Sequence, residues 1–294
     1  MRFKMFVFLS ILAFTAGVVW AHSPDAEPPS TFALSLDGPE GLAVTRKGDL
    51  VVGSSNGQIR SYKSDGTFKI LANVGEALAG ITELKDGRIL AASLANSRVW
   101  SITPSGITSV FATVNSPNFI VQTGRKPPGR KRRIFVSSSL SNSIVEITNG
   151  TPTTVLTGLS FPNGMAMGRH RYLYVAETAL NRVSRFQMNR DGSFGPLEVY
   201  KTGLSLPDGI AFDRRDNLLV VGNGLVQIID GKTRALTTLP SHLAFNYPSN
   251  IAFGRGRGGF RRTDVFVANF GPGLGDGTSI AHFTYNHHGA RLIR

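Results

Sequence analysis

The sequence predicts an all-β fold, a six-bladed β-propeller with four-stranded blades, from two observations. One is a short phrase that recurs six times, starting at residues 39, 78, 117, 162, 207 and 248. The other is that short β-branched or alternating segments, separated by Gly, Asn and Asp turns, follow each copy. A repeat of roughly 40 residues that contains four strands is typical of a propeller blade. No helical period of comparable length follows residue 22.

Each strand of a blade has its own pattern. The phrase predicts the innermost strand, and its six copies read PEGLA, LAGIT, PNFIV, PNGMA, PDGIA and PSNIA. The second strand is apolar, as in residues 172–176, while the third alternates, as in residues 182–186, and residues 196–200 exemplify the fourth. The last repeat has only residues 290–294 for its outer strand. We therefore expect residues 31–36 to join the last blade and close the ring, which hides two open strand edges.

The N-terminus predicts export. Residues 1–21 resemble a signal peptide, with a basic start, an apolar run and a small residue, Ala21, at the end. An uncleaved membrane anchor is the open alternative, although the run is short for a span. We expect residues 22–30 to form a flexible tail and residues 31–294 to form the propeller domain. The protein would then be secreted, extracellular or periplasmic, with no transmembrane span after cleavage.

The chain contains no Cys, so the core and any bound metal must supply stability without disulfides. Its net charge is +13, or 13 − 2 = +11 without Arg2 and Lys4. In a propeller the turns between first and second strands share one face. These turns hold 18 of the 32 basic residues, namely Arg46, Lys47, Lys85, Arg88, Arg125, Lys126, Arg130, Lys131, Arg132, Arg133, Arg169, Arg171, Arg214, Arg215, Arg255, Arg257, Arg261 and Arg262.

Solvation of turns explains why charges gather there but not why they share one sign. The sharper hypothesis is that this basic face binds an anionic surface, such as phospholipid or acidic polysaccharide. Nucleic acid is not expected, because no aromatic residues interleave the basic ones.

The second residue of the phrase carries the functional hypothesis, because in a ring the six copies converge on the channel mouth. In order, these column residues are Glu40, Ala79, Asn118, Asn163, Asp208 and Ser249. Carboxylate and amide oxygens suit a hard divalent cation, which would also relieve an unpaired carboxylate in a narrow channel. The favoured ion is Ca²⁺. No His or Cys lies among the column residues, which argues against Zn²⁺, although Zn²⁺, Mg²⁺ and Mn²⁺ stay open as alternatives. Packing and turn chemistry alone are the competing explanation of the column.

Three segments resemble the senescence-marker-protein/gluconolactonase family: FPNGMAM at 161–167, YLYVAET at 172–178 and LPDGIAF at 206–212. The resemblance spans residues 37 to about 285 and extends distantly to paraoxonases and diisopropylfluorophosphatase. It implies a six-bladed propeller with a catalytic divalent ion at the channel mouth, held by Glu, Asn, Asn and Asp in that order. This order is met by Glu40, Asn118, Asn163 and Asp208, with Ala79 at a blade that supplies no ligand.

The resemblance also implies hydrolysis of lactones, esters or phosphotriesters, with Asp208 as general base or nucleophile. One departure concerns Asn118, which is followed by Phe119 instead of Asp-Gly and has no closely preceding Arg. This departure argues against a sugar lactone and predicts a more apolar rim. Other candidates for the surroundings of the ion are Ser249, Glu177 and Asn223, although turn chemistry explains the last two nearly as well.

Two other classes of protein fit the same repeat. An NHL-like propeller would catalyse nothing and would bind a partner or an anionic surface through its basic face. A propeller resembling strictosidine synthase would need no metal, which the ordered ligand set disfavours. Because a scaffold has no need for Glu40, we expect a secreted metal-dependent hydrolase, lactonase- or esterase-like, acting on a small-molecule lactone or ester.

Overall fold

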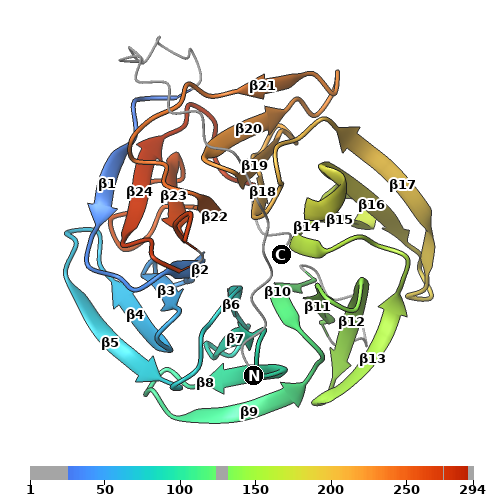
Figure 1. Ribbon diagram of the computed structural model, residues 1–294, viewed down its shortest axis with the longest axis horizontal. Coiled ribbons are helices and arrows are strands. Elements are labelled where there is room, and N and C mark those ends of the chain that lie inside the picture. Colours follow the sequence, from blue (N-terminus) through green and yellow to red (C-terminus); the bar gives the residue numbers. More distant parts are fainter. Residues whose placement is uncertain (1–25, 124–131, 274, 291–294) are drawn as a thin grey trace.

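Six antiparallel sheets of four strands each form a closed ring in the computed structural model (Figure 1). The structure describes residues 26–123, 132–273 and 275–290. Within these residues the predicted six-bladed propeller is confirmed, and the helical elements are two short 3-10 turns, η1 (Arg169–Arg171) and η2 (Thr178–Leu180). No helix in the described part of the chain has the length and apolar character needed to span a bilayer.

The first three blades follow the repeat in chain order, each with its first strand nearest the channel (Figure 1). Blade 1 consists of β2 (Pro39–Val44), β3 (Leu50–Ser54), β4 (Gln58–Tyr62) and β5 (Phe68–Asn73). Blade 2 consists of β6 (Ile81–Glu83), β7 (Ile89–Ser93), β8 (Arg98–Ile102) and β9 (Thr108–Thr113). Blade 3 consists of β10 (Pro117–Gln122), β11 (Ile134–Ser138), β12 (Ser143–Thr148) and β13 (Thr151–Leu156).

The remaining blades repeat this arrangement, except that the last borrows a strand from the N-terminal side. Blade 4 consists of β14 (Pro162–Met167), β15 (Tyr172–Glu177), β16 (Arg182–Met188) and β17 (Phe194–Thr202). Blade 5 consists of β18 (Ile210–Phe212), β19 (Leu218–Gly222), β20 (Leu225–Ile229) and β21 (Leu236–Thr238). Blade 6 consists of β22 (Pro248–Phe253), β23 (Asp264–Asn269), β24 (Ser279–Thr284) and β1 (Ser30–Ala33).

The ring closes where β1 pairs with β24, as the sequence predicts. Ser30 lies opposite His282, and the strand Ser30–Ala33 overlaps the predicted segment 31–36 at residues 31–33. The predicted flexible tail is wrong for residues 26–30, because Ala26 is buried and bridges to Tyr285, and the Glu27 N–H donates to a carbonyl of β24 at 2.9 Å. The rest of the predicted tail and signal peptide lies outside the described residues.

The core lies between neighbouring blades. The second strand of each blade is nearly free of solvent, because both of its faces pack against adjacent sheets; β3, β7, β11 and β19 are buried at every position. This burial explains why these segments read as continuous apolar runs. At the closure, the Phe32 ring on β1 packs edge-on against Tyr62, Phe260 and Phe266 at centroid distances of 5.9, 5.7 and 5.2 Å.

The innermost strands approach one another so closely that the third residue of the phrase is Gly in four repeats. A Cβ on Gly41 would lie 2.0 Å from the Ala79 carbonyl oxygen, and one on Gly164 would lie 2.1 Å from that of Asp208. The N–H groups of Gly80, Gly164 and Gly209 donate to the column residue of the next blade at 2.7, 3.1 and 2.9 Å. Backbone contact between blades therefore dictates the Gly of the phrase.

Replacing Gly164 by Ala should destabilise the protein by about 2–3 kcal/mol, because the new methyl group must displace backbone of blade 5. Chemical denaturation measures the change. The matched control is Gly195→Ala, whose Cβ would meet only Gln187 atoms at 3.6 Å and beyond. Equal stability of the two variants would contradict the argument.

Removing the Phe32 side chain from the closing strand β1 should also lower the free energy of unfolding. Phe32→Ala removes three ring contacts and should cost about 2–3 kcal/mol, less than a fully buried Phe because the side chain is half-buried. Leu34→Ala, at a residue that is 63% exposed, should change the free energy by less than about 0.5 kcal/mol. A neutral Phe32→Ala would mean that β1 contributes little to closure.

Candidate functional site

The column residues lie outside the regular ladders of their strands. In four blades the register shifts within the phrase, between Pro39/Gly41, Pro117/Ile120, Pro162/Met165 and Pro248/Asn250. In blades 2 and 5 the strand begins only two residues after the column residue, at Ile81 and Ile210. A bulge leaves a residue unpaired and redirects its side chain. The irregularity therefore turns the column side chains away from the sheets at the inner edge of the ring.

A left-handed residue precedes every Pro that begins a phrase. The φ angles, between 42° and 53°, belong to Gly38, Ser116, Phe161, Leu206 and Tyr247. Bulky side chains rarely adopt positive φ, and such strain is concentrated at functional sites. The second repeat has Leu78 in place of Pro and lacks this feature. It is also the repeat whose column residue, Ala79, carries no ligand atom in its side chain.

The carboxyl groups of Glu40 from blade 1 and Asp208 from blade 5 interact with each other electrostatically. Burial raises the pKa of Glu40 to about 7. Burial, and then the charge of Glu40, raise the pKa of Asp208 well above its usual value. No hydrogen-bond donor or cation among the described residues offsets either effect. Two carboxylates that repel each other at a half-buried position are a charge arrangement that a cation would stabilise.

The two column amides add oxygen atoms to this set. Asn118 and Asn163 are buried, with exposed fractions of 4% and 5%. The Asn163 amide nitrogen donates to Thr178 Oγ1 at 3.4 Å, and that hydroxyl donates to the Pro207 carbonyl at 2.7 Å. The amide oxygen of Asn163 is buried and accepts no hydrogen bond within the described structure. A buried carbonyl oxygen without a donor is unfavourable, and a metal ion would satisfy it.

The donor set fits a hard cation. Glu40, Asn118, Asn163 and Asp208 offer carboxylate and amide oxygens with a formal charge of −2, as Ca²⁺ prefers. The described residues contain no group of three or more His, Cys, Asp or Glu side chains that could hold a metal. The site therefore depends on its amides, and further oxygens from water or substrate would complete the coordination.

Ser249 is a column residue, but its hydroxyl contacts backbone carbonyl groups. Its side chain is 3% exposed, and its hydroxyl lies within donating distance of the Glu40 carbonyl at 3.2 Å and of the Ala268 carbonyl at 3.4 Å. The first of these contacts joins blade 6 to blade 1. Ser249 therefore holds the carbonyl of Glu40, beside the carboxylate that would bind the ion.

Three other predicted neighbours of the site make their contacts elsewhere. Glu177 is fully buried, and its carboxylate accepts from Arg182 at 2.7 and 3.1 Å, from Ser184, and from the Ser160 N–H at 2.9 Å. These contacts tie blade 4 together. Asn223 is exposed and donates to a neighbouring loop hydroxyl at 2.9 Å. Phe119 is partly buried and packs against the core cluster of blades 3 and 4.

Two residues near the site were missed from the sequence. Thr178 orients the Asn163 amide, as described above. Tyr247 is within reach of the Asp208 charge: burial, and then that charge, raise the pKa of the Tyr247 phenol. The signal for Thr178 was available, since Ser139 follows the second strand of blade 3 at the equivalent position and donates to the Pro162 carbonyl at 2.7 Å. Tyr247 has no comparable signal in the repeat.

Comparison with known proteins supports this description of the fold. The chain matches the family model described as the SMP-30/gluconolactonase/LRE-like region over residues 15–259. A gluconolactonase from Xanthomonas campestris has 18% sequence identity and a TM-score of 0.70, with 87% of this chain and 89% of that chain covered. No curated protein sequence matches.

Further solved structures include proteins of different activity. The calcium-binding protein regucalcin from Agrobacterium tumefaciens has 16% identity and a TM-score of 0.68, with 91% of this chain and 98% of that one covered. The virginiamycin B lyase from Staphylococcus aureus has 18% identity and a TM-score of 0.62, over 87% and 98%. At these identities the structural likeness establishes the fold alone. The family match covers well over half of the sequence, and the chain therefore belongs to the SMP-30/gluconolactonase/LRE-like family.

Proposed function

We propose that this protein is a divalent-metal-dependent hydrolase of lactone or ester bonds, with Ca²⁺ as the favoured ion. One observation carries the proposal. The carboxylates of Glu40 and Asp208, from blades 1 and 5, share one end of the channel without a compensating cation, together with the unsatisfied amide oxygen of Asn163. Membership of a family that includes gluconolactonases and the calcium-binding regucalcin supports it. Because a lyase shares the fold, the fold does not decide the reaction; the donor set argues for a metal ion, and the gluconolactonase-containing family argues for hydrolysis.

The chemistry divides between the ion and the chain. When bound, a divalent ion supplies positive charge that polarises a substrate carbonyl and keeps nearby carboxylates ionised. Asp208 then takes a proton from the attacking water as general base. The water oxygen forms a bond to the carbonyl carbon, the ring C–O bond breaks, and the proton passes to the departing oxygen. The product is a hydroxy acid, and Asp208 returns to its ionised state.

The loops around this end of the channel favour an apolar substrate. Leu140 and Leu180 lie in turns between second and third strands, and Leu243 lies in the loop before β22. Strand alternation puts these loops at the same end of the propeller as the column. The three side chains are 62%, 48% and 100% exposed, so apolar surface is available at this end. A lactone or ester with a hydrocarbon portion would bury this surface, whereas a sugar lactone would not.

Export remains part of the proposal, because residues 1–21 have the composition of a signal peptide. N-terminal sequencing of the protein from its native host decides the matter. A first residue at or near His22 supports export, and an intact Met1 points to an anchor.

Glu40→Gln should abolish high-affinity Ca²⁺ binding in calorimetry, because it removes one of the two charges of the donor set.

Asp208→Asn should lower kcat/KM by at least about a hundredfold in a screen of lactones, aryl esters and phosphotriesters. A chelator should lower kcat/KM of the unmodified protein to a similar extent. Asn223→Ala, at an exposed turn residue, is the control and should retain both properties. A protein that folds normally, ignores divalent ions and turns over no substrate would instead be a non-catalytic scaffold of the NHL type.

The metal-free protein should become less stable as pH rises. A carboxyl whose pKa is raised on folding, as for Glu40, stabilises the folded state below its unfolded value of 4.5, and this contribution is lost as pH rises to about 7. With chelator present, Tm should therefore fall over this range, and Glu40→Gln should flatten the profile. Excess Ca²⁺ should raise Tm most at the alkaline end, since binding requires ionised ligands. Identical profiles for the two proteins in chelator would rule out the buried carboxylate pair.

A further inference from the structure

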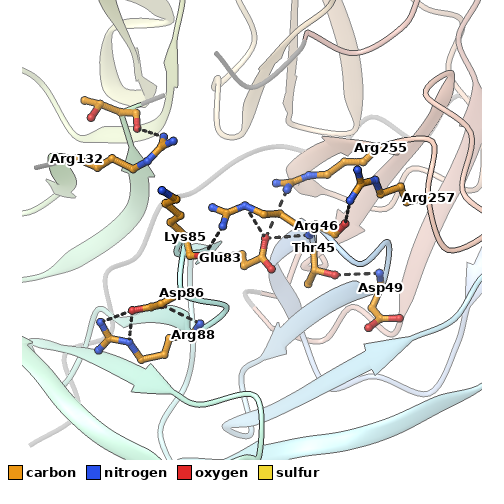
Figure 2. Close-up of polar contacts among 11 residues, drawn as sticks. Thr45, Arg46, Asp49, Glu83, Lys85, Asp86, Arg88, Arg132, Arg255 and Arg257 are labelled. Atoms are coloured by element: carbon orange, nitrogen blue, oxygen red, sulfur yellow. Dashed lines mark hydrogen bonds and ion pairs between the residues drawn. The ribbon is translucent and has the colours of Figure 1, made fainter. Parts of the chain in front are cut away.

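The end of the channel opposite to the column is surrounded by basic side chains (Figure 2). Of the 18 basic residues that the sequence predicted in turns between first and second strands, 14 lie in described turns, and residues 125, 126, 130 and 131 lie outside the described part. Because these turns all connect first to second strands, they share one face of the ring. Five of the side chains come from blades 1, 2, 3 and 6 and are called the basic mouth: Arg46, Lys85, Arg132, Arg255 and Arg257.

One buried carboxylate, Glu83, is shared by two arginines of the basic mouth. Its side chain is 7% exposed. The backbone N–H of Arg46 donates to Glu83 Oε2 at 2.9 Å, and the Arg46 guanidinium Nε lies 3.8 Å from the same oxygen. Arg255 Nη1 approaches that oxygen from blade 6 at 3.5 Å. Neither guanidinium forms the paired, two-hydrogen-bond contact that Arg makes with a carboxylate, so both keep donors available.

The other contacts of the basic mouth position its charges without neutralising them. Arg46 donates to the Lys85 carbonyl, Arg257 donates to the Arg46 carbonyl at 3.4 Å, and Arg132 donates to the Thr123 carbonyl at 2.9 Å. Among the described residues, no carboxylate pairs with Lys85, Arg132 or Arg257. Five cations therefore face one carboxylate, which leaves an excess of four positive charges around the axis.

The nearby acids are used elsewhere, and burial adds to the imbalance. Asp49 pairs with Lys63, and Asp86 pairs with Arg88 at 2.8 Å. The Arg255 side chain is only 26% exposed. Burial lowers its pKa, and the opposing effect of Glu83 is partly cancelled by the Arg46 charge. A half-buried cation in this position is stabilised by an anion that reaches the same space.

We propose that the basic mouth binds a phosphate-type dianion, with Arg46 and Arg255 as its central donors and Lys85, Arg132 and Arg257 around it. Guanidinium groups match the oxygen geometry of phosphate, and a tetrahedral dianion can accept hydrogen bonds from several blades at once. A monocarboxylate would leave most of the excess charge unpaired. The site lies at the far end of the channel from the column, so it does not depend on the proposed hydrolase activity.

A second basic position on the same face is less suitable. A cavity of about 250 Å³ lies between blades 4 and 5, lined in part by Arg169, Arg214 and Asp216. There Arg169 already pairs with Asp216 at 2.8 Å and donates to the Arg214 carbonyl at 3.0 Å. Two guanidinium groups face one carboxylate here, so the excess is one positive charge, against four at the basic mouth.

Calorimetry of the full-length protein with inorganic phosphate, at low ionic strength, tests the site. Arg255→Gln and Lys85→Gln should each weaken binding by at least about tenfold. Arg190→Gln and Lys69→Gln remove the same charge away from the mouth, at the exposed turn between β16 and β17 and on the exposed edge of β5, and should change affinity by less than about twofold. Melting curves check that Arg255→Gln folds; Lys85→Gln gives the same test without disturbing Glu83.

The same variants distinguish the two sources of phosphate. Vesicles of phosphatidylcholine containing phosphatidic acid are compared with vesicles of phosphatidylcholine alone. Binding to the first kind that free phosphate displaces, and that Arg255→Gln removes, identifies a lipid head group. Phosphate binding without vesicle binding identifies a soluble anion. Absence of phosphate binding, or equal loss in the Arg255→Gln and Arg190→Gln variants, overturns the proposal, because the face would then act only through its overall charge.

Discussion

The whole structure depends on the backbone contact between neighbouring innermost strands. At three of the six junctions the carbonyl of a column residue accepts a hydrogen bond from the Gly at the third phrase position of the preceding blade, as Asp208 does from Gly164 at 3.1 Å. This contact leaves no room for a side chain at the third position, and it occupies the column residue's own backbone oxygen. The column side chain takes no part in this backbone contact. The same constraint that joins the blades therefore prepares six converging positions whose chemistry can vary without disturbing the ring.

Strand alternation separates the two chemistries of the molecule. Every phrase begins at one end of the channel, where the carboxyl groups of Glu40 and Asp208 lie. Every first turn lies at the other end, where Arg46 and Arg255 share Glu83. The channel thus has an acidic end and a basic end. Both ends arise from the same repeat, because each innermost strand runs from its column residue at one end to its basic turn at the other.

The blade pattern and the column were predictable because both repeat. Local alternation defines each strand, and six copies define the ring, so closure by residues near 31 followed from a missing outer strand. The features that the sequence did not predict depend on contacts that form only in the folded chain. Ala26 is ordered by its bridge to Tyr285, which no local pattern reveals. Glu177 ends the second strand of blade 4, near the site, yet its ion pair with the partly buried Arg182 holds the carboxylate within the blade. Tyr247, from the neighbouring blade, interacts with Asp208, which sequence spacing does not reveal.

The pairing of β1 with β24 also governs the order in which the chain can become complete. Ser30 and His282 are 252 positions apart, so the first strand to be synthesised must wait for the last. Until then the chain is an open arc with two unpaired edges, and closing it carries the loop entropy of nearly the entire domain. A polypeptide interrupted before residue 279 lacks β24 and has no partner for its opening strand. The β1–β24 pairing can therefore form only after β24 has been synthesised, and only then can the ring close around the channel.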